Sequence, residues 1–328
     1  MLFRSIAITG GRNIGDAYFT LNQHSNFIDL DVVAAGEIVP QLSATFDAFW
    51  NSRYAYPIAS VASAEQSEST SAPLVETDLP ANSKWLAREL DDGTLNLLWV
   101  PATVLADKPA KLADDAESDA DITVANNIGA LMRSAKQELL IISPYFIPGA
   151  DGMTLMQQLV AQGVHIRVLT NSLASTDSPL VYTGYSRYRA GLLKLGVDLR
   201  EMRPKLGQRR PRFHPFQSSN ASLHAKALVI DQKTVFIGSM NMDARSARTN
   251  SELGLVIRSP EIARQVTSLL DDISAAGSYK LELDRNDRIV WSSGDPGAMQ
   301  EWYTDPETTR MQRFLLRLLA PFAPEELL

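Results

Sequence analysis

The sequence of 328 residues has no cysteine, which removes disulfide bridges, thiolate metal sites and cysteine nucleophiles from consideration. It also has no long apolar run. The longest one, residues 139–147, is broken by Ser143 and Pro144 and is far shorter than the roughly 20 residues that cross a bilayer. The sequence therefore predicts no membrane-spanning helix and is compatible with a protein that lies on a membrane surface.

Basic residues are in the minority, with 31 Lys and Arg against 38 Asp and Glu and a net charge of −7. A surface of this overall sign does not attract a polyanion as a whole. Hydrophobic residues make up 45% of the chain, which is ordinary for globular proteins and excludes collagen-like and wholly disordered chains. At roughly 150 residues a domain, the length fits two domains or one large one.

Helix-like and strand-like patterns alternate along most of the chain. Residues 139–142 form a continuous apolar run that predicts a buried strand, and apolar residues at helical spacing precede it at 128–135. The same criteria predict a helix at 182–193 and further strands at 28–34, 95–100, 164–169, 197–202 and 223–230. Strands that alternate with helices predict an α/β fold with a mixed sheet flanked by helices.

Composition divides the chain into four segments. Residues 57–83 are small and polar, as in a linker or a long loop, and an acidic run at 114–121 is typical of a solvated loop. We therefore predict a folded N-terminal segment at 1–56, a connecting segment at 57–121, a larger α/β unit at 122–295 and a C-terminal amphipathic helix at 296–328.

Two segments of the sequence resemble each other. Residues 10–13 (Gly-Gly-Arg-Asn) follow a strand-like Ile-Ala-Ile run, and residues 238–241 (Gly-Ser-Met-Asn) follow a strand-like Val-Phe-Ile run. Each is followed by a strand that opens with a carboxylate, Asp29 or Glu252, and then by a helix that begins near a proline. The repeat predicts that the chain is built from two related α/β units.

Four polar side chains are predicted to converge in the second unit. His224 and Lys226 lie two apart on the predicted strand 223–230 and so project from the same face. Ser239 and Asn241 lie two apart at the end of the next strand. An ammonium and two neutral donors suit the nonbridging oxygens of a phosphodiester, and an imidazole can attack phosphorus or transfer a proton. This set needs no metal ion or other cofactor.

The run from Leu223 to Asn241 resembles the HxKx4Dx6GSxN motif of the phospholipase D superfamily. Residues 241–253 extend the resemblance, and so do residues 10–19 (Gly-Gly-Arg-Asn-Ile-Gly-Asp-Ala-Tyr-Phe) and 142–148 (Ile-Ser-Pro-Tyr-Phe-Ile-Pro). Together these segments are similar to bacterial cardiolipin synthases of the C-type branch, and the similarity covers nearly the whole chain.

This resemblance implies a fold and a reaction. The fold is two α/β halves packed as a pseudo-dimer, with one motif from each half at a single active site. One histidine attacks a phospholipid phosphodiester to form a phosphohistidine, and the other protonates the leaving alcohol and then activates an acceptor hydroxyl. The implied enzyme is a phosphatidyltransferase that acts, without a cofactor, on phosphatidylglycerol and phosphatidylethanolamine-type substrates. It is expected to be peripheral, at the cytoplasmic side of the bacterial inner membrane.

The resemblance also implies roles for individual residues. His224 matches the acid/base histidine of the second motif, and Glu252 matches the carboxylate that orients the histidine. Asp231 completes this catalytic motif, with a structural more than a chemical part. Asp29, in the first unit, is the counterpart of Glu252. The residues that match phosphate contacts are Lys226, Ser239, Asn241, Gly11 and Asn13.

The first motif departs from the family pattern. Its spacing places the aspartate at position 3, which is Phe3, and places the lysine and histidine before Met1. His24 lies outside the motif spacing and is no substitute. We therefore expect an N-terminally truncated sequence with little activity alone. Three explanations stay open: a fragment or a late gene start, a degenerate copy that binds phosphate esters without turnover, or two chains that each lend His224 to a shared site. The oligomeric state is not indicated.

Two further segments bear on the partner. Six basic residues between 200 and 212 suit an anionic ligand or form a solvated loop. The helix predicted after Asp305-Pro306 carries arginines at 310, 313 and 317 largely opposite apolar residues, which is typical of a helix on an anionic membrane or of one packed on its own domain. Apolar segments at 144–147 and 215–216 favour lipid over nucleic acid as the partner. A phospholipase D or nuclease-type phosphodiesterase stays an alternative.

Overall fold

The computed structural model describes residues 6–19, 21–22, 24–61, 88–89, 92, 94, 97–112, 123–205, 220–294 and 298–320. Some sequence predictions fall outside these residues. They are most of the polar linker, the acidic run at 114–121, and the basic and apolar positions within 206–219.

The described strands make one large mixed sheet and two small pairs. In spatial order the large sheet contains β14 (Gln300–Trp302), β13 (Ile289–Ser293), β12 (Ser278–Leu283), β7 (Asp198–Met202), β6 (His165–Asn171), β5 (Glu138–Ile142), β9 (Ala227–Ile230), β10 (Thr234–Gly238), β11 (Leu253–Arg258) and β4 (Ala102–Ala106). Strands β5, β6 and β7 run parallel, and the other neighbours are antiparallel. The pairs are β1 (Ile6–Gly10) with β3 (Asp31–Ala35), antiparallel, and β2 (Ser25–Ile28) with β8 (Asn220–Leu223), parallel.

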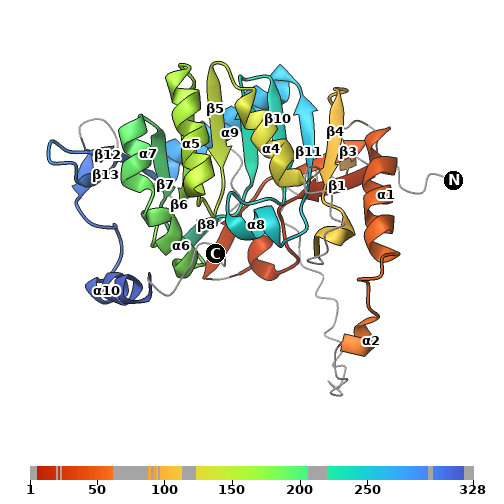
Figure 1. Ribbon diagram of the computed structural model, residues 1–328, viewed down its shortest axis with the longest axis horizontal. Coiled ribbons are helices and arrows are strands. Elements are labelled where there is room, and N and C mark those ends of the chain that lie inside the picture. The colour runs from red at the N-terminus through yellow and green to blue at the C-terminus, as the bar shows by residue number, and fades with distance from the viewer. Residues whose placement is uncertain are drawn as a thin grey trace.

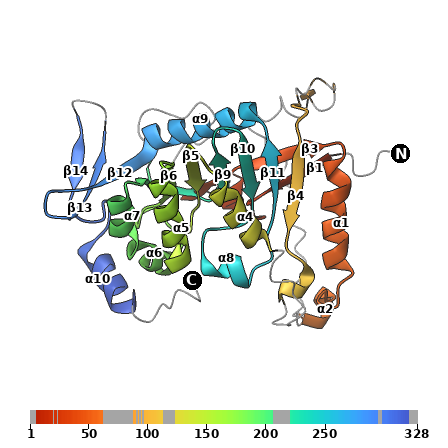
Figure 2. The ribbon, with the colours of Figure 1, turned by 45° about the horizontal axis from the view of Figure 1, so that its top comes forward.

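Helices cover both faces of the large sheet (Figure 1). They are α1 (Ile38–Trp50), α2 (Ile58–Val61), α4 (Val124–Arg133), α5 (Gly149–Ala161), α6 (Pro179–Ser186), α7 (Arg189–Leu195), α8 (Ala244–Arg248), α9 (Pro260–Gly277) and α10 (Arg310–Leu319), with 3-10 turns at Asp16–Tyr18 and Pro109–Leu112. Helices α4, α5 and α7 lie on one face, α9 lies on the other, and α1 stands beside the β4 edge (Figure 2). The predicted fold class, a mixed sheet flanked by helices, is confirmed, and the helix predicted at 182–193 is two helices, α6 and α7.

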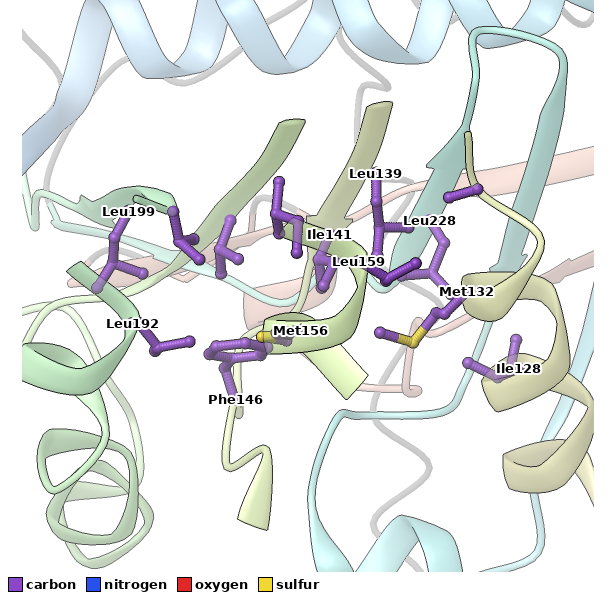
Figure 3. Packing of buried hydrophobic residues seen from close by; sticks show 14 of the residues in the cluster. Ile128, Met132, Leu139, Ile141, Phe146, Met156, Leu159, Leu192, Leu199 and Leu228 are labelled. Carbon is purple, nitrogen blue, oxygen red and sulfur yellow. The ribbon is translucent and has the colours of Figure 1, made fainter. Parts of the chain in front are cut away.

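The buried core explains why β5 is apolar at almost every position. Leu139 and Ile141 point to the layer that contains α4 and α5, whereas Leu140 and Ile142 point to the layer that contains α9. A strand covered on both faces loses the polar-apolar alternation of a half-exposed strand. Figure 3 shows the first layer, where helical side chains such as Met156 pack over the strands.

Three predicted strands differ from the structure. The strand predicted at 95–100 begins later, as β4, and joins part of the predicted connecting segment to the large sheet. The strand predicted at 28–34 is broken at Asp29 into β2 and β3, and the one predicted at 223–230 is broken at 224–226 into β8 and β9. At both breaks the chain changes pairing partner, because β2 and β8 pair with each other and not with the neighbours of β3 and β9.

Candidate active site

The break between β8 and β9 places His224 where β5 and β6 end. The buried His224 donates its backbone N–H to the carbonyl oxygen of Ile28 (2.7 Å). Its Nδ1 lies 2.7 Å from Oδ2 of Asp29, whose side chain is fully buried. A carboxylate only accepts hydrogen bonds, so Nδ1 carries the proton in this contact. Nε2 is therefore the ring nitrogen that can exchange a proton with a ligand.

Lys226 lies beside the imidazole. Its Nζ donates to the His224 carbonyl oxygen (2.7 Å) and lies 3.1 Å from each ring nitrogen. Burial of this side chain lowers the pKa of Lys226 to about 8, while the carboxylates of Asp29 and Glu252 oppose the shift. The site thus holds an ammonium group that has lost most of its water, and such a cation attracts an anionic ligand strongly.

The ends of β10 and β11 supply further polar groups. Ser239 Oγ donates to Oε2 of Glu252 (2.5 Å), and the Glu252 backbone N–H donates to the buried carboxylate of Asp107 (3.0 Å). Oδ1 of Asn241 is buried and has no hydrogen-bond partner among the described residues. Buried amide oxygens are normally paired, so this oxygen is an acceptor available to a hydroxyl or N–H group of a ligand.

The N-terminal repeat closes over the same place. Gly11 lies against Lys226, because a Cβ at position 11 would come within 2.9 Å of the lysine Cδ and 3.2 Å of the Gly238 carbonyl oxygen. A larger residue therefore does not fit at position 11 without displacing the lysine. Asn13 Nδ2 donates to the hydroxyl of Tyr18 (3.0 Å). The structure brings the two repeat motifs together, as the resemblance implies.

Tyr18 and Phe27 line the site, and the sequence analysis assigned neither to it. The Tyr18 hydroxyl lies 3.5 Å from Nε2 of His224, and the tyrosine ring stacks on Phe27 with centroids 4.5 Å apart. The Phe27 ring centroid lies 5.2 Å from that of the imidazole. These rings shield the imidazole from water. Tyr18 belongs to the family-like run 10–19, which is a signal for its place here, whereas Phe27 carries no such signal.

The contact predicted for Glu252 differs from the one found. Glu252 accepts a hydrogen bond from Ser239, and the carboxylate on Nδ1 of His224 is Asp29. The histidine of the second unit is therefore oriented by the first unit. The repeat pairs Asp29 with Glu252 by position but does not tell which histidine each one serves.

Asp231 does not belong to the site. It lies beyond the far end of β9, about 16 Å from Lys226 along a strand that rises 3.3 Å a residue. Its carboxylate accepts the backbone N–H groups of Lys136, Gln137 and Glu138 at 2.7–3.1 Å. Its grouping with the catalytic residues is therefore wrong, and its structural part is to hold the start of β5 beside the turn after β9.

Together these residues offer a proton-exchanging imidazole, a buried ammonium and an unpaired amide oxygen to one ligand. The ammonium can stabilise charge on the nonbridging oxygens of a phosphodiester, and the amide oxygen can accept a hydrogen bond from a ligand hydroxyl. Within the described ranges, no group of three or more histidine or carboxylate side chains is placed to hold a metal ion.

Comparison with known proteins identifies the family. Residues 128–273 match the family model described as "Cardiolipin synthase, PLD-like domain". Cardiolipin synthase C from Escherichia coli (strain K12) is 34% identical over 98% of this chain and 71% of the relative. The chain belongs to the cardiolipin synthase family of the phospholipase D superfamily. An uncharacterized protein from Helicobacter pylori (strain 26695) is 29% identical over 95% of this chain and 62% of its own length.

The fold of this cardiolipin synthase family member is also found in a solved structure. The crystal structure of phosphatidylserine synthase from Haemophilus influenzae Rd KW20 matches with a TM-score of 0.60 and 13% identity, over 99% of this chain and 69% of that one. Identity this low shows a common fold alone. In the described part of this chain, no helix has the length and apolar character to cross a membrane.

Two of the six basic residues between 200 and 212 form ion pairs within the cardiolipin synthase-family fold. Arg200 lies 3.3 Å from Asp198, and Arg203 lies 3.0 Å from Glu307 with its guanidinium 5.2 Å from the ring centroid of Tyr279. These contacts occupy the two guanidinium groups in partly exposed ion pairs, and binding of an anionic ligand by the cluster stays a prediction. The members at 209–212 lie outside the described residues.

The buried Asp243, two residues after Asn241, should make the stability of the protein depend on pH. It accepts the N–H of Ser246 (2.8 Å) at the start of α8, and burial raises its pKa to about 6. Because this value exceeds the ordinary 3.8, its contribution to stability is fully present below pH 3.8 and is lost as the pH rises through 6. We expect Asp243→Asn, which keeps a capping side chain, to be more stable than the parent above pH 6 by on the order of 1–3 kcal/mol. Urea unfolding across this pH range measures the gap, and a gap that does not shrink toward acid contradicts the prediction.

Proposed function

We propose that this site transfers phosphatidyl groups between phospholipid headgroups, as a phosphatidyltransferase of the cardiolipin synthase type. The observation that carries the proposal is the contact between His224 and Asp29, because it joins both repeat units in one site and leaves Nε2 to exchange protons beside the buried Lys226. The names of the relatives support phospholipid substrates. The substrates proposed are phosphatidylglycerol and phosphatidylethanolamine-type lipids, at the cytoplasmic side of the inner membrane.

The proposed reaction has two steps. A nucleophilic histidine attacks the phosphorus of the donor lipid, a P–N bond forms, and the P–O bond to the leaving alcohol breaks as His224 gives that oxygen a proton. An acceptor hydroxyl then gives its proton to His224, its oxygen attacks the phosphorus, and the P–N bond breaks. Lys226 and Asn241 hold the nonbridging oxygens in both steps. His224 is thus acid first and base second.

The proposed activity of these 328 residues alone is low. The sequence contains a single His-x-Lys motif, at 224–226, and the mechanism above uses a second histidine. This observation also supports a second candidate function, in which the chain binds phosphate esters without turning them over.

Mass spectrometry of lipids tests the proposal. The chain, His224→Ala, and a version extended at the N-terminus by a strand with a second His-x-Lys are each incubated with phosphatidylglycerol and phosphatidylethanolamine. We expect cardiolipin near background from the chain, clear formation by the extended version, and loss when the extended version carries His224→Ala. If the 328-residue chain turns over lipid robustly and His224→Ala abolishes this turnover, the proposal of low activity is wrong. If turnover survives His224→Ala, the assignment of the active site to His224 is wrong. Salt-sensitive retention of DNA without lipid turnover favours a nuclease.

A further inference from the structure

Helix α10 presents an apolar face that the rest of the described chain leaves open. It begins at Arg310 and not directly after Pro306, because Thr309 and Gln312 form a capping box. Five of its six large apolar side chains are between 45% and 65% exposed; they are Met311, Phe314, Leu315, Leu318 and Leu319. A helix that packs its apolar stripe on its own domain buries such side chains. The apolar stripe of α10 is therefore not what packs on the domain, contrary to that interpretation of the sequence pattern.

The helix is attached to the domain by its other side. At about 100° a residue, the five exposed side chains span an arc of about 140°. Arg313 and Leu316, which are half-buried, lie on the opposite side of the helix. Helix α10 packs on α6, and Arg187 donates to the carbonyl oxygen of Ala320 (2.7 Å). The apolar arc therefore points away from the protein.

All charges on α10 are positive, in a chain whose net charge is −7. Arg310 and Arg317 are exposed and lie at one border of the apolar arc. Long arginine stems can run along an apolar surface while the guanidinium reaches phosphate groups at its edge. An apolar arc bordered by arginines is complementary to an anionic bilayer surface, with acyl chains below and headgroup phosphates beside it.

The position of α10 relates this face to the active site. Asn171, at the end of β6, bonds to both backbone groups of Leu223, directly before His224. The chain then runs from β6 into α6, against which α10 packs. Figures 1 and 2 show α6, α8 and α10 near the same end of the strands of the large sheet.

We propose that α10 is the element that docks this protein on an anionic phospholipid bilayer, with its apolar arc in the headgroup region and the active-site end of the sheet toward the lipid. The docking itself requires no turnover. Its benefit, access to phospholipid substrates, rests on the function proposed above.

Vesicle co-sedimentation of the full 328-residue chain tests the docking. Vesicles are phosphatidylcholine alone or equal parts phosphatidylcholine and phosphatidylglycerol. We expect the parent to bind the mixed vesicles. The affinity for these vesicles should fall about tenfold or more in Phe314→Glu/Leu318→Glu. In Arg310→Gln/Arg317→Gln it should fall about fivefold for each arginine removed. The arginine variant should not change binding to phosphatidylcholine alone. Circular dichroism checks that the variants keep their fold.

A matched control separates α10 from other exposed apolar residues. Phe46 and Trp50 are exposed on α1 with ring centroids 5.7 Å apart, and Phe46→Glu/Trp50→Glu should bind as the parent does. His224→Ala should also bind as the parent does, so that headgroup capture by the site is distinguished from docking. The proposal is overturned if Phe314→Glu/Leu318→Glu binds the mixed vesicles as the parent does, or if either control loses as much vesicle binding as this variant. It is also overturned if light scattering shows that the α10 changes convert a dimer to a monomer without altering vesicle binding.

Discussion

A Lys226→Met variant should bind a soluble phosphodiester, such as dihexanoyl-phosphatidylglycerol, about a hundredfold more weakly than the parent and yet be more stable. The ligand loses its buried cationic partner. The folded protein loses an ammonium whose burial lowers its pKa to about 8 from the ordinary 10.5, which is a destabilisation on the order of 1–3 kcal/mol. Calorimetric titration measures the binding, and urea unfolding at neutral pH measures the stability.

The matched control for Lys226 is a second buried lysine. Lys111 Nζ lies 2.6 Å from Asp107 and donates to the carbonyl oxygen of Ser246 (3.0 Å), so Lys111→Met leaves a buried carboxylate without its cation and should destabilise the protein. If Lys226→Met also destabilises, its ammonium serves the fold and the prediction fails.

The pH dependence of the Lys226 effect has a defined sign. The folded-state pKa lies below the ordinary value, so the destabilisation by the buried charge is full below pH 8 and disappears as the pH rises toward 10.5. The stability gap between Lys226→Met and the parent should close over this range. Phosphodiester binding by the parent should weaken over the same range as Lys226 loses its proton.

An Arg189→Met variant should lose about 3–5 kcal/mol of stability, the second large effect we expect. Arg189 is buried and lies 2.9 Å from Asp305 and 3.4 Å from the fully buried Glu201. Its guanidinium carbon lies 5.0–5.9 Å from the ring centroids of Tyr182, Tyr185 and Trp291. Methionine keeps most of the volume but leaves the carboxylates without their cation. Burial raises the pKa of Glu201, so this carboxylate depends on its partners to stay ionised.

Two further variants define the Arg189 result, again by urea unfolding. Lys194→Met breaks an exposed ion pair with Asp287 and should cost less than about 1 kcal/mol. Arg189→Met/Glu201→Gln removes cation and carboxylate together and should recover part of the loss. A double variant less stable than Arg189→Met would mean that Glu201 acts through Tyr185 and Trp291, which donate to it at 2.9 Å, and not through Arg189.

The sequence predicts the parallel part of the sheet because its strands are buried on both faces. Leu139 to Ile142 is apolar throughout. A run this short, between two helical patterns, fits a buried strand better than a buried helix. The convergence of His224 and Lys226 could also be predicted, because their spacing is local. Their side chains meet although they lie in the gap between two strands and not within one.

Contacts that depend on pairing partners could not be predicted. Residues 223–230 alternate like one strand, and nothing local shows that Leu223 pairs with Ile28 while Ala227 pairs with Ile142. For the same reason the sequence places Asp29 and Glu252 at equivalent positions without showing that Asp29 holds His224. Strand β4 forms at 102–106 because β11 offers its edge there, which is again a tertiary effect.

The parallel pairing of β2 with β8 has a consequence for folding order. Asp29 and His224 are 195 positions apart in the chain, so their contact closes one of the longest loops in the molecule. Contacts within β5, β6 and β7 are far more local and cost less chain entropy to form. The sheet can therefore assemble before the N-terminal segment docks, and the imidazole gains its carboxylate partner last. By the same reasoning, local opening of that segment leaves a folded core without a functional site.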